Sequence, residues 1–318
     1  MARSDLLLKL VEAGATGDRA LARRATEAII AEEKSRQHHA LADRLTRALT
    51  SNPTLVAGPV PKGRDYLAEI TPRRQLADIV LLPDTRTSID ELIEEQSRSD
   101  VLRAHGLEPR NRLLLIGPPG NGKTSLAEAI AESLNVGFFV VRYELLIGSY
   151  LGETAARLRR TLDYARTKPC VLFFDEFDAI AKERGDTHET GEVKRVVSSL
   201  LMQIDELPSH TVLVGATNHP ELLDRAAWRR FQLQVDLPAP KQIDITAYIS
   251  AFAPTFGDDL GASPATIAKR LGKVCYAEVE EFCLDIRRAQ ILATRDKPLK
   301  AIVQHKLNMW KRRSRKGD

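Results

Sequence analysis

The stretch 113–125 constrains the fold of this 318-residue chain more than any other. Four apolar residues at 113–116 predict a buried strand, and the pattern Gly-x-x-x-x-Gly-Lys-Thr follows at 117–124. Apolar residues then recur at helical spacing from Leu126 to Leu134. A strand, a glycine-rich loop and a helix in this order are typical of a P-loop, which wraps around phosphate groups. The sequence therefore predicts a nucleotide-binding site at this loop.

The residue types in the loop suit that chemistry. Glycines let the backbone come close enough for its N–H groups to point at phosphate oxygens, and the following helix adds the positive end of its dipole. A lysine brings positive charge to the β- and γ-phosphates of ATP, and a threonine hydroxyl can bind Mg²⁺. A glycine-rich turn without a ligand is the alternative. The predicted nucleotide-binding residues in this loop are Gly117, Pro118, Pro119, Gly120, Asn121, Gly122, Lys123, Thr124 and Ser125.

Two other predicted strands end in polar side chains. The apolar run 170–174 is followed by Asp175 and Glu176. We expect Asp175 to join Thr124 in binding Mg²⁺, and Glu176 to polarise the attacking water as a base. Asn218 comes after the run 212–216, where its amide can orient that water. A polar cap on the strand is the alternative for Asn218.

Apolar runs alternate with helical patterns along the middle of the chain. Strands are expected at 113–116, 136–141, 170–174 and 212–216, with a fifth that ends at Val235. Strands that alternate with helices predict parallel pairing. The expected fold class is therefore α/β, with the parallel sheet of a P-loop NTPase sandwiched by helices.

The chain divides into four predicted parts. Residues 1–50 are expected to form an N-terminal helical hairpin, which serves either to recruit an adaptor or substrate or to dimerise or pack as a coil. Residues 51–63 are rich in proline and glycine and predict a linker. The α/β nucleotide-binding domain is expected at 64–240. Residues 241–318 predict a small, all-helical C-terminal lid domain with a basic tail.

Composition excludes several classes of protein. Apolar residues make up 43% of the chain, which is a globular level, and the net charge of +4 is too small to indicate nucleic-acid binding by itself. The three cysteines are odd in number and form no C-x-x-C pair, so they are expected to be reduced. No apolar run is long enough to span a membrane, and no signal peptide is evident. We therefore expect a cytoplasmic protein.

From about residue 110 to 295, the chain resembles the ATPase module of the AAA+ family, in its classical AAA clade. The pattern is similar to that of the katanin and spastin group and of the AAA modules of membrane-bound proteases. Residues 117–124 match the Walker A motif of the family, and residues 173–180 match its extended Walker B motif. Residues 216–218 match sensor 1, and residues 223–231 match the start of the second region of homology.

The resemblance implies roles for residues that spacing alone would not single out. Arg229 and Arg230 correspond to arginine fingers, which would reach the γ-phosphate held by a neighbouring subunit, so that activity requires a ring, typically a hexamer. Tyr150, Leu151 and Gly152 fall where the family has a substrate-gripping pore loop. The alternatives are a pair of ordinary surface arginines and an aromatic side chain packed in the core.

The lid and the adenine pocket complete the expected nucleotide site. Ala277 falls where classical members carry a small residue in place of the sensor-2 arginine. Ile79 and Val80 lie where an apolar pocket for the adenine ring could form. The expected cofactors are ATP and Mg²⁺.

The leading hypothesis for function is an ATP-driven remodeller that assembles into a ring and pulls on a protein substrate with its pore loops. The sequence contains no His-Glu-x-x-His and no Gly-x-Ser-x-Gly, so any coupled protease would be a separate partner enzyme. The alternative is a DNA-associated helper ATPase of the helicase-loader or transposition type, which the basic tail favours weakly.

Overall fold

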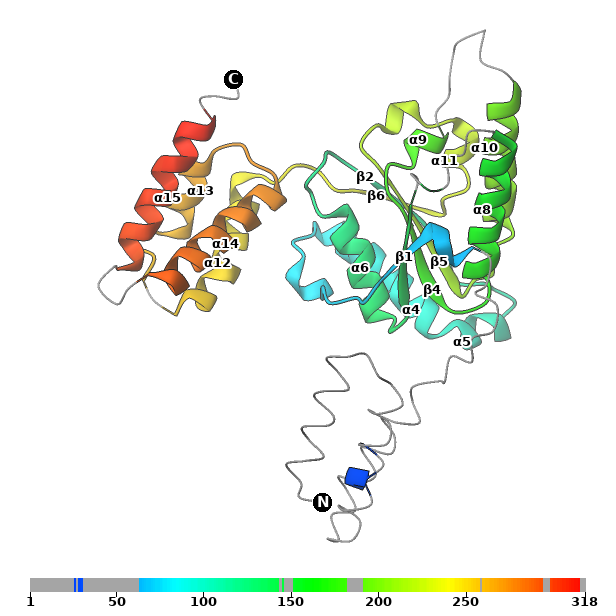
Figure 1. Ribbon diagram of the computed structural model, residues 1–318, viewed down its shortest axis with the longest axis horizontal. Coiled ribbons are helices and arrows are strands. Elements are labelled where there is room, and N and C mark those ends of the chain that lie inside the picture. Colours follow the sequence, from blue (N-terminus) through cyan, green and yellow to red (C-terminus); the bar gives the residue numbers. More distant parts are fainter. Residues whose placement is uncertain are drawn as a thin grey trace. The chain divides into compact units, whose positions relative to one another are not determined.

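A computed structural model describes residues 26, 28–30, 63–142, 145, 151–181, 191–257, 259–293 and 298–314. The chain forms two compact units, Met1–Val60 and Pro61–Asp318. The second unit contains the sheet and all of the helices labelled in Figure 1. The helical hairpin predicted at 1–50 lies outside the described residues, except for residues 26 and 28–30, which are helical.

A six-stranded sheet forms the centre of the second unit. The strands lie in the order β1-β3-β4-β5-β2-β6. Every neighbouring pair is parallel except β1 and β3, which are antiparallel. The fold class is therefore α/β, as the sequence predicts. The strands are β1 (Leu67–Ile70), β2 (Arg112–Ile116), β3 (Gly137–Val141), β4 (Cys170–Phe174), β5 (Thr211–Thr217) and β6 (Leu233–Asp236).

Helices follow most of the strands along the chain, and four more helices follow the last strand. Short 3₁₀ turns occupy Arg64–Tyr66, Leu76–Asp78, Pro220–Leu222 and Ala253–Phe256. The helices are α4 (Pro83–Ser97), α5 (Ser99–Ala104), α6 (Lys123–Ser133), α8 (Leu151–Ala165), α9 (Asp178–Ala181), α10 (Gly191–Asp205), α11 (Arg225–Trp228), α12 (Gln242–Phe252), α13 (Pro264–Leu271), α14 (Tyr276–Leu292) and α15 (Leu299–Ser314).

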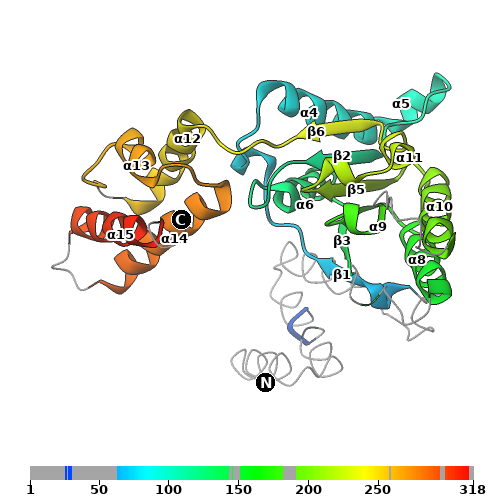
Figure 2. The same cartoon turned by 90° about the horizontal axis from the view of Figure 1, so that it is seen from above.

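Helices cover both faces of the sheet. Successive side chains of a strand point to opposite faces, so each buried strand supplies two cores. On β4, Phe174 packs in one core with side chains of α8 and α10, whereas Phe173 packs in the other core with side chains of α4 and α6. Figures 1 and 2 show the sheet between these two pairs of helices. This explains why the central strands read as continuous apolar runs in the sequence.

The five strands that the sequence predicts are all present, but β1 was not predicted. It is an edge strand that pairs with β3, with Leu67 opposite Val141. Only Leu67 of its four residues is buried, and both Glu69 and Ile70 are exposed. A short edge strand with one buried side chain leaves too little periodic signal in the sequence to be recognised.

The four helices α12 to α15 enclose a hydrophobic core of their own. Ile249, Phe282 and Val303 lie in this core, and Trp310 packs edge-on against Phe282 at 5.9 Å between ring centroids. The predicted boundary at residue 240 falls between β6 and α12. The C-terminal helices are thus organised around side chains that the sheet does not share.

The strand order brings three predicted motifs to one edge of the sheet. β4, β5 and β2 are neighbours, and they are parallel. Their carboxyl ends therefore meet at the same edge, where ligands bind in open α/β sheets. The P-loop follows β2, Asn218 follows β5, and Asp175 and Glu176 follow β4.

The packing of β4 generates a prediction for stability. Phe173→Ala should lower the free energy of unfolding by about 3–5 kcal/mol, because the ring is fully buried and the cavity would be only partly refilled. Met202→Ala on α10 should change it by less than about 0.5 kcal/mol, because this side chain is 63% exposed. Denaturant unfolding followed by circular dichroism measures both, and equal losses would contradict the assignment of the core.

Candidate active site

A cavity of about 350 Å³ lies at the carboxyl edge of the sheet. It is lined by residues from the P-loop, the segment before α4, α12 and α14, and by residues that directly follow β4 and β5. The sequence-predicted residues that it brings together are Ile79, Val80, Pro119, Gly120, Asn121, Gly122, Lys123, Thr124, Ser125, Asp175, Glu176, Asn218 and Ala277. Arg74, Asp78, Tyr248, Tyr276 and Glu280 also line the cavity, although no role was predicted for them.

Two glycines of the P-loop have a positive φ and a close neighbour, which is backbone at Gly117 and a side chain at Gly120. Gly117 has a φ of 152°, and a Cβ at this position would lie 2.1 Å from the carbonyl oxygen of Leu237. Gly120 has a φ of 76°, and a Cβ there would lie 2.6 Å from the Sγ of Cys275. A larger residue at either position would push the loop away from its neighbours. The loop conformation therefore depends on glycine at both ends of this turn.

Lys123 lies at the centre of the site, and only 7% of it is exposed. Its Nζ donates hydrogen bonds to the carbonyl oxygens of Gly117 (2.6 Å) and Pro118 (3.0 Å) and to the Oδ1 of Asn218 (2.6 Å). Burial lowers the pKa of this ammonium group, while the charges of Asp175 and Asp178 act to raise it. The side chain thus joins the P-loop to the end of β5 with three oxygen acceptors.

Glu176 has an unusual backbone conformation. Its φ is 45°, in the left-handed region that residues other than glycine seldom adopt. The neighbouring residue fixes this turn, because Phe177 donates its N–H to the carbonyl oxygen of Ala216 at 2.7 Å and buries its ring between Phe174 and Phe231. The turn leaves the Glu176 side chain exposed and lining the cavity. Strained residues of this kind concentrate at functional sites.

The turn that carries Asn218 is held by the residue before it. Thr217 is fully buried; its hydroxyl donates to Asp178 Oδ1 at 2.6 Å and accepts the N–H of His219 at 2.9 Å. The first bond joins the end of β5 to α9, and the second fixes the turn that follows β5. Sequence reasoning singled out Asn218 but not this support, because Asp178 lies in another motif of the chain.

The N-terminus of α14 contacts the P-loop directly. Ala277 donates its N–H to the carbonyl oxygen of Gly120 at 2.9 Å, and Tyr276 lies with its N–H 3.5 Å from Asn121 Oδ1. Asn121 is 5% exposed, and within the described part of the chain its Nδ2 has no hydrogen-bond partner. The first turn of α14 therefore completes one wall of the cavity.

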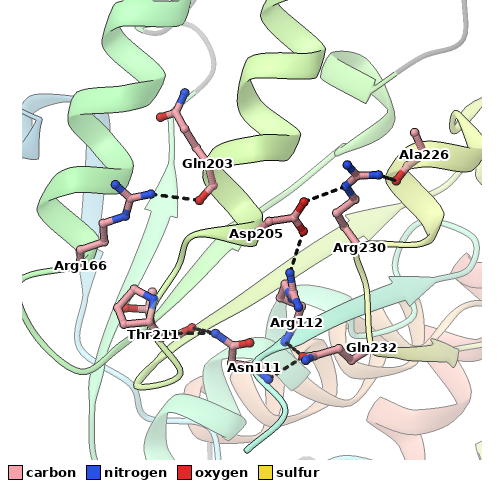
Figure 3. Close-up of polar contacts among 10 residues, drawn as sticks. Asn111, Arg112, Arg166, Gln203, Asp205, Thr211, Ala226, Arg230 and Gln232 are labelled. Atoms are coloured by element: carbon pink, nitrogen blue, oxygen red, sulfur yellow. Dashed lines mark hydrogen bonds and ion pairs between the residues drawn. The ribbon is translucent and has the colours of Figure 1, made fainter. Parts of the chain in front are cut away.

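Arg229 and Arg230 do not line the cavity of their own chain. Arg229 is exposed, whereas Arg230 donates from Nε to Asp205 Oδ2 (3.2 Å) and from Nη1 to the carbonyl oxygen of Ala226 (3.0 Å). Figure 3 shows Asp205 between two guanidinium groups, because Arg112 donates to its other oxygen at 2.8 Å. The two adjacent arginines thus differ in their surroundings: Arg230 is paired with Asp205, whereas Arg229 is exposed.

The predicted pore-loop unit consists of Tyr150, Leu151 and Gly152. Tyr150 lies outside the described residues. Leu151 and Gly152 begin helix α8 (Leu151–Ala165), and their side chains are not described. The pore-loop role of these three residues stays a prediction.

The unpredicted lining residues come from segments that lack a motif. Arg74 precedes the turn Leu76–Asp78, Asp78 is the last residue of that turn, and Tyr248 lies on α12. Tyr276 and Glu280 belong to the same helix as Ala277, so their position beside Ala277 was the one signal that could have indicated them. The tyrosines add an aromatic wall, with 6.1 Å between their ring centroids.

The residues of the cavity fit a magnesium–nucleotide complex. The buried ammonium of Lys123 and the N–H groups at the start of α6 are suited to phosphate oxygens, because the first N–H groups of a helix have no acceptor within it. Hydroxyl and carboxylate oxygens, which Mg²⁺ prefers, come from Thr124 and Asp175. A Cβ at position 120 would disturb this arrangement.

Comparisons with known proteins agree with this chemistry. Residues 113–239 match the family model described as ATPase family associated with various cellular activities (AAA). The uncharacterized AAA family ATPase y4kL of Sinorhizobium fredii is 37% identical over 307 residues, which cover 93% of this chain and 91% of that protein.

Two peroxisomal ATPases are similar over part of their length. PEX6 of Candida glabrata is 40% identical over 174 residues, or 52% of this chain. Pex6 of Schizosaccharomyces pombe is 34% identical over 253 residues, or 72% of this chain. The matched region spans 17% and 27% of these two proteins, so the likeness concerns one part of much longer chains.

Within the described part of the chain, no helix combines the length and the apolar character needed to cross a bilayer.

Cys275 lies beside Gly120 of the P-loop, and its accessibility can be measured by its reaction with a thiol reagent. Burial raises the pKa of Cys170 to about 11 and that of Cys283 to about 12, and both side chains are inaccessible. Burial raises the pKa of Cys275 as well, but this side chain is only partly buried, so a reagent can reach it. At pH 8, one thiol of the three should therefore react rapidly with a disulfide reagent such as dithionitrobenzoate, since the thiolate is the attacking form. Cys275→Ser should remove this fast phase, and a fast phase that survives the substitution would contradict the structure.

Proposed function

We propose that this chain, which belongs to the ATPase family associated with various cellular activities (AAA) and hydrolyses ATP, acts as a ring-forming remodeller of proteins. The observation that carries the proposal is the single cavity that collects the P-loop, Asp175, Glu176, Asn218 and the start of α14. Phosphoryl transfer depends mainly on positioning and electrostatics, and this set of groups supplies both.

The proposed roles follow from the position of each side chain. When ATP binds, the Nζ of Lys123 donates hydrogen bonds to the β- and γ-phosphate oxygens in place of the carbonyl oxygens that accept them here. Thr124 and Asp175 hold Mg²⁺, which neutralises phosphate charge when it is bound. Glu176, aimed into the cavity by its strained turn, acts as the base that polarises water, and Asn218 orients that water. The remaining nucleotide-binding residues, with roles in the phosphate cradle and the base pocket, are Gly117, Pro118, Pro119, Gly120, Asn121, Gly122, Ser125, Ile79, Val80 and Ala277.

The two arginines support a shared active site. Neither lines the cavity of its own chain, which suits action on the nucleotide of a neighbouring subunit. We infer a division of work in which the exposed Arg229 reaches the neighbour, while Asp205 holds Arg230 in position beside it. Such contacts require a closed ring, and we propose six subunits on the basis of the family resemblance.

The proposed substrate is a polypeptide. Support comes from the similarity to the PEX6 ATPases and from the pore-loop prediction for Tyr150, Leu151 and Gly152. In this proposal the residues 1–50 recruit the substrate or an adaptor, a separate enzyme can act on the product, and the ring works in the cytoplasm. Binding to DNA would instead indicate a helper ATPase of the helicase-loader type.

Two variants separate binding from hydrolysis. Lys123→Ala should abolish binding of a fluorescent ATP analogue, because the site then lacks the buried ammonium group that attracts the phosphates. Glu176→Gln should bind the analogue normally but lower the ATPase rate by about 10²-fold or more, because only the base is lost. Fluorescence titration and phosphate release measure these effects. Normal turnover by Glu176→Gln would remove this residue from the catalytic role.

The ring is tested by the mass of Glu176→Gln in light scattering. With Mg·ATP, we expect an assembly of about six subunits, because blocked hydrolysis retains the nucleotide that joins the subunits. Adding Arg229→Ala should dissociate it, whereas Met202→Ala, at an exposed residue with no role in the site, should not. A monomer at saturating ATP would contradict the ring, and in that case salt-sensitive binding to a DNA duplex would support the helper-ATPase alternative.

A further inference from the structure

One ion pair in the cavity wall connects two distant parts of the chain. Arg74 lies just before the turn Leu76–Asp78, and Glu280 lies on α14, 206 residues later. Arg74 Nη2 donates to Glu280 Oε1 at 2.6 Å. Both residues line the cavity, together with Ile79 and Tyr248. The pair therefore joins the segment before α4 to the C-terminal helices at the site itself.

Each partner is also anchored to the phosphate-binding element. On one side, Glu128 of α6 accepts the N–H of Arg73 at 2.8 Å and the N–H of Arg74 at 3.2 Å. On the other side, Glu280 lies one turn along α14 from Ala277, which donates its N–H to the P-loop at Gly120. The contacts are therefore continuous: α6 follows the P-loop and binds Arg74, Arg74 binds Glu280, and the helix of Glu280, α14, binds the P-loop.

The surroundings of Arg74 favour its charged form. The hydrogen bond that Arg74 donates to Glu280 is the largest influence that raises the pKa of Arg74, and burial acts in the opposite direction. Burial raises the pKa of the neighbouring Tyr248 to about 12, so its hydroxyl is neutral and does not compete as an anion. The side chains of Arg74 and Glu280 are 43% and 29% exposed, which places the pair between solvent and cavity.

We propose that the Arg74–Glu280 ion pair closes the wall of the nucleotide site and sets the rate at which nucleotide is released. For α14 to move away from the P-loop side, the pair must break, because it spans the two walls. Breaking it frees the α14 wall to move while leaving Lys123 and the phosphate cradle intact. This inference rests on the proposed assignment of the cavity to ATP and ADP.

The test is a charge-reversal cycle on the full chain. The dissociation rate of a fluorescent ADP is measured by stopped flow, with excess ATP as the chase, for wild type, Arg74→Glu, Glu280→Arg and the double variant. Each single reversal should speed release about fivefold or more, because like charges then face each other across the wall. The double variant should release ADP within about twofold of wild type, because the attraction is restored with opposite polarity.

A matched control and a second measurement keep the result interpretable. Arg64 forms a similar pair with Glu69 at 3.0 Å, and neither residue lines the cavity, so Arg64→Glu should leave the release rate unchanged. Where a reversal prevents folding, Arg74→Gln and Glu280→Gln replace it. For wild type, raising the NaCl concentration from about 50 to 500 mM should speed release, and this salt effect should be smaller in Glu280→Gln, where only the attraction between ADP and Lys123 is left to screen.

The outcomes separate this inference from the proposed function. Release at the wild-type rate in both single variants, or a double variant whose effect equals the product of the two singles, would overturn the role of the pair while leaving nucleotide binding in place. Failure of the wild-type chain to bind the fluorescent ADP would overturn the assignment of the cavity, and with it this inference.

Discussion

The proposed nucleotide site depends on one buried ammonium group. Lys123 donates to the carbonyl oxygens of two P-loop residues and to the amide oxygen of Asn218, and these three bonds hold the ends of β2 and β5 together. A buried cation is stable only where oxygen acceptors surround it, so the loop must fold back over Lys123. The same acceptors leave the charge directed at the place where phosphate oxygens are expected.

Two features of the fold place other groups of the site around Lys123. The parallel order β4-β5-β2 is one, because it sets Asp175, Glu176 and Asn218 beside the P-loop at a single edge. The other is the start of α14, which donates to the P-loop and adds its own wall. The edge of the sheet forms one side of the cavity, and α14, from the C-terminal part of the chain, forms another. Ala277 and Glu280 of α14 contact Gly120 and Arg74 on the sheet side.

How much of the site the sequence predicts depends on whether a residue belongs to a local motif. The P-loop, Asp175, Glu176 and Asn218 each follow an apolar strand directly, so strand order alone brings them together. Ile79, Val80 and Ala277 were also expected, and all three line the cavity. Strand β1 was missed because only Leu67 is buried in it.

By itself, the sequence determined the α/β fold and predicted the phosphate-binding chemistry, because both depend on short runs in which strand, loop and helix are consecutive. Only the tertiary structure decided which charges meet. Arg74 pairs with Glu280 across 206 residues, and Asp205 pairs with both Arg112 and Arg230. No pattern of spacing records such pairs, because an ion pair requires only two side chains that the packing of distant elements brings within hydrogen-bond distance.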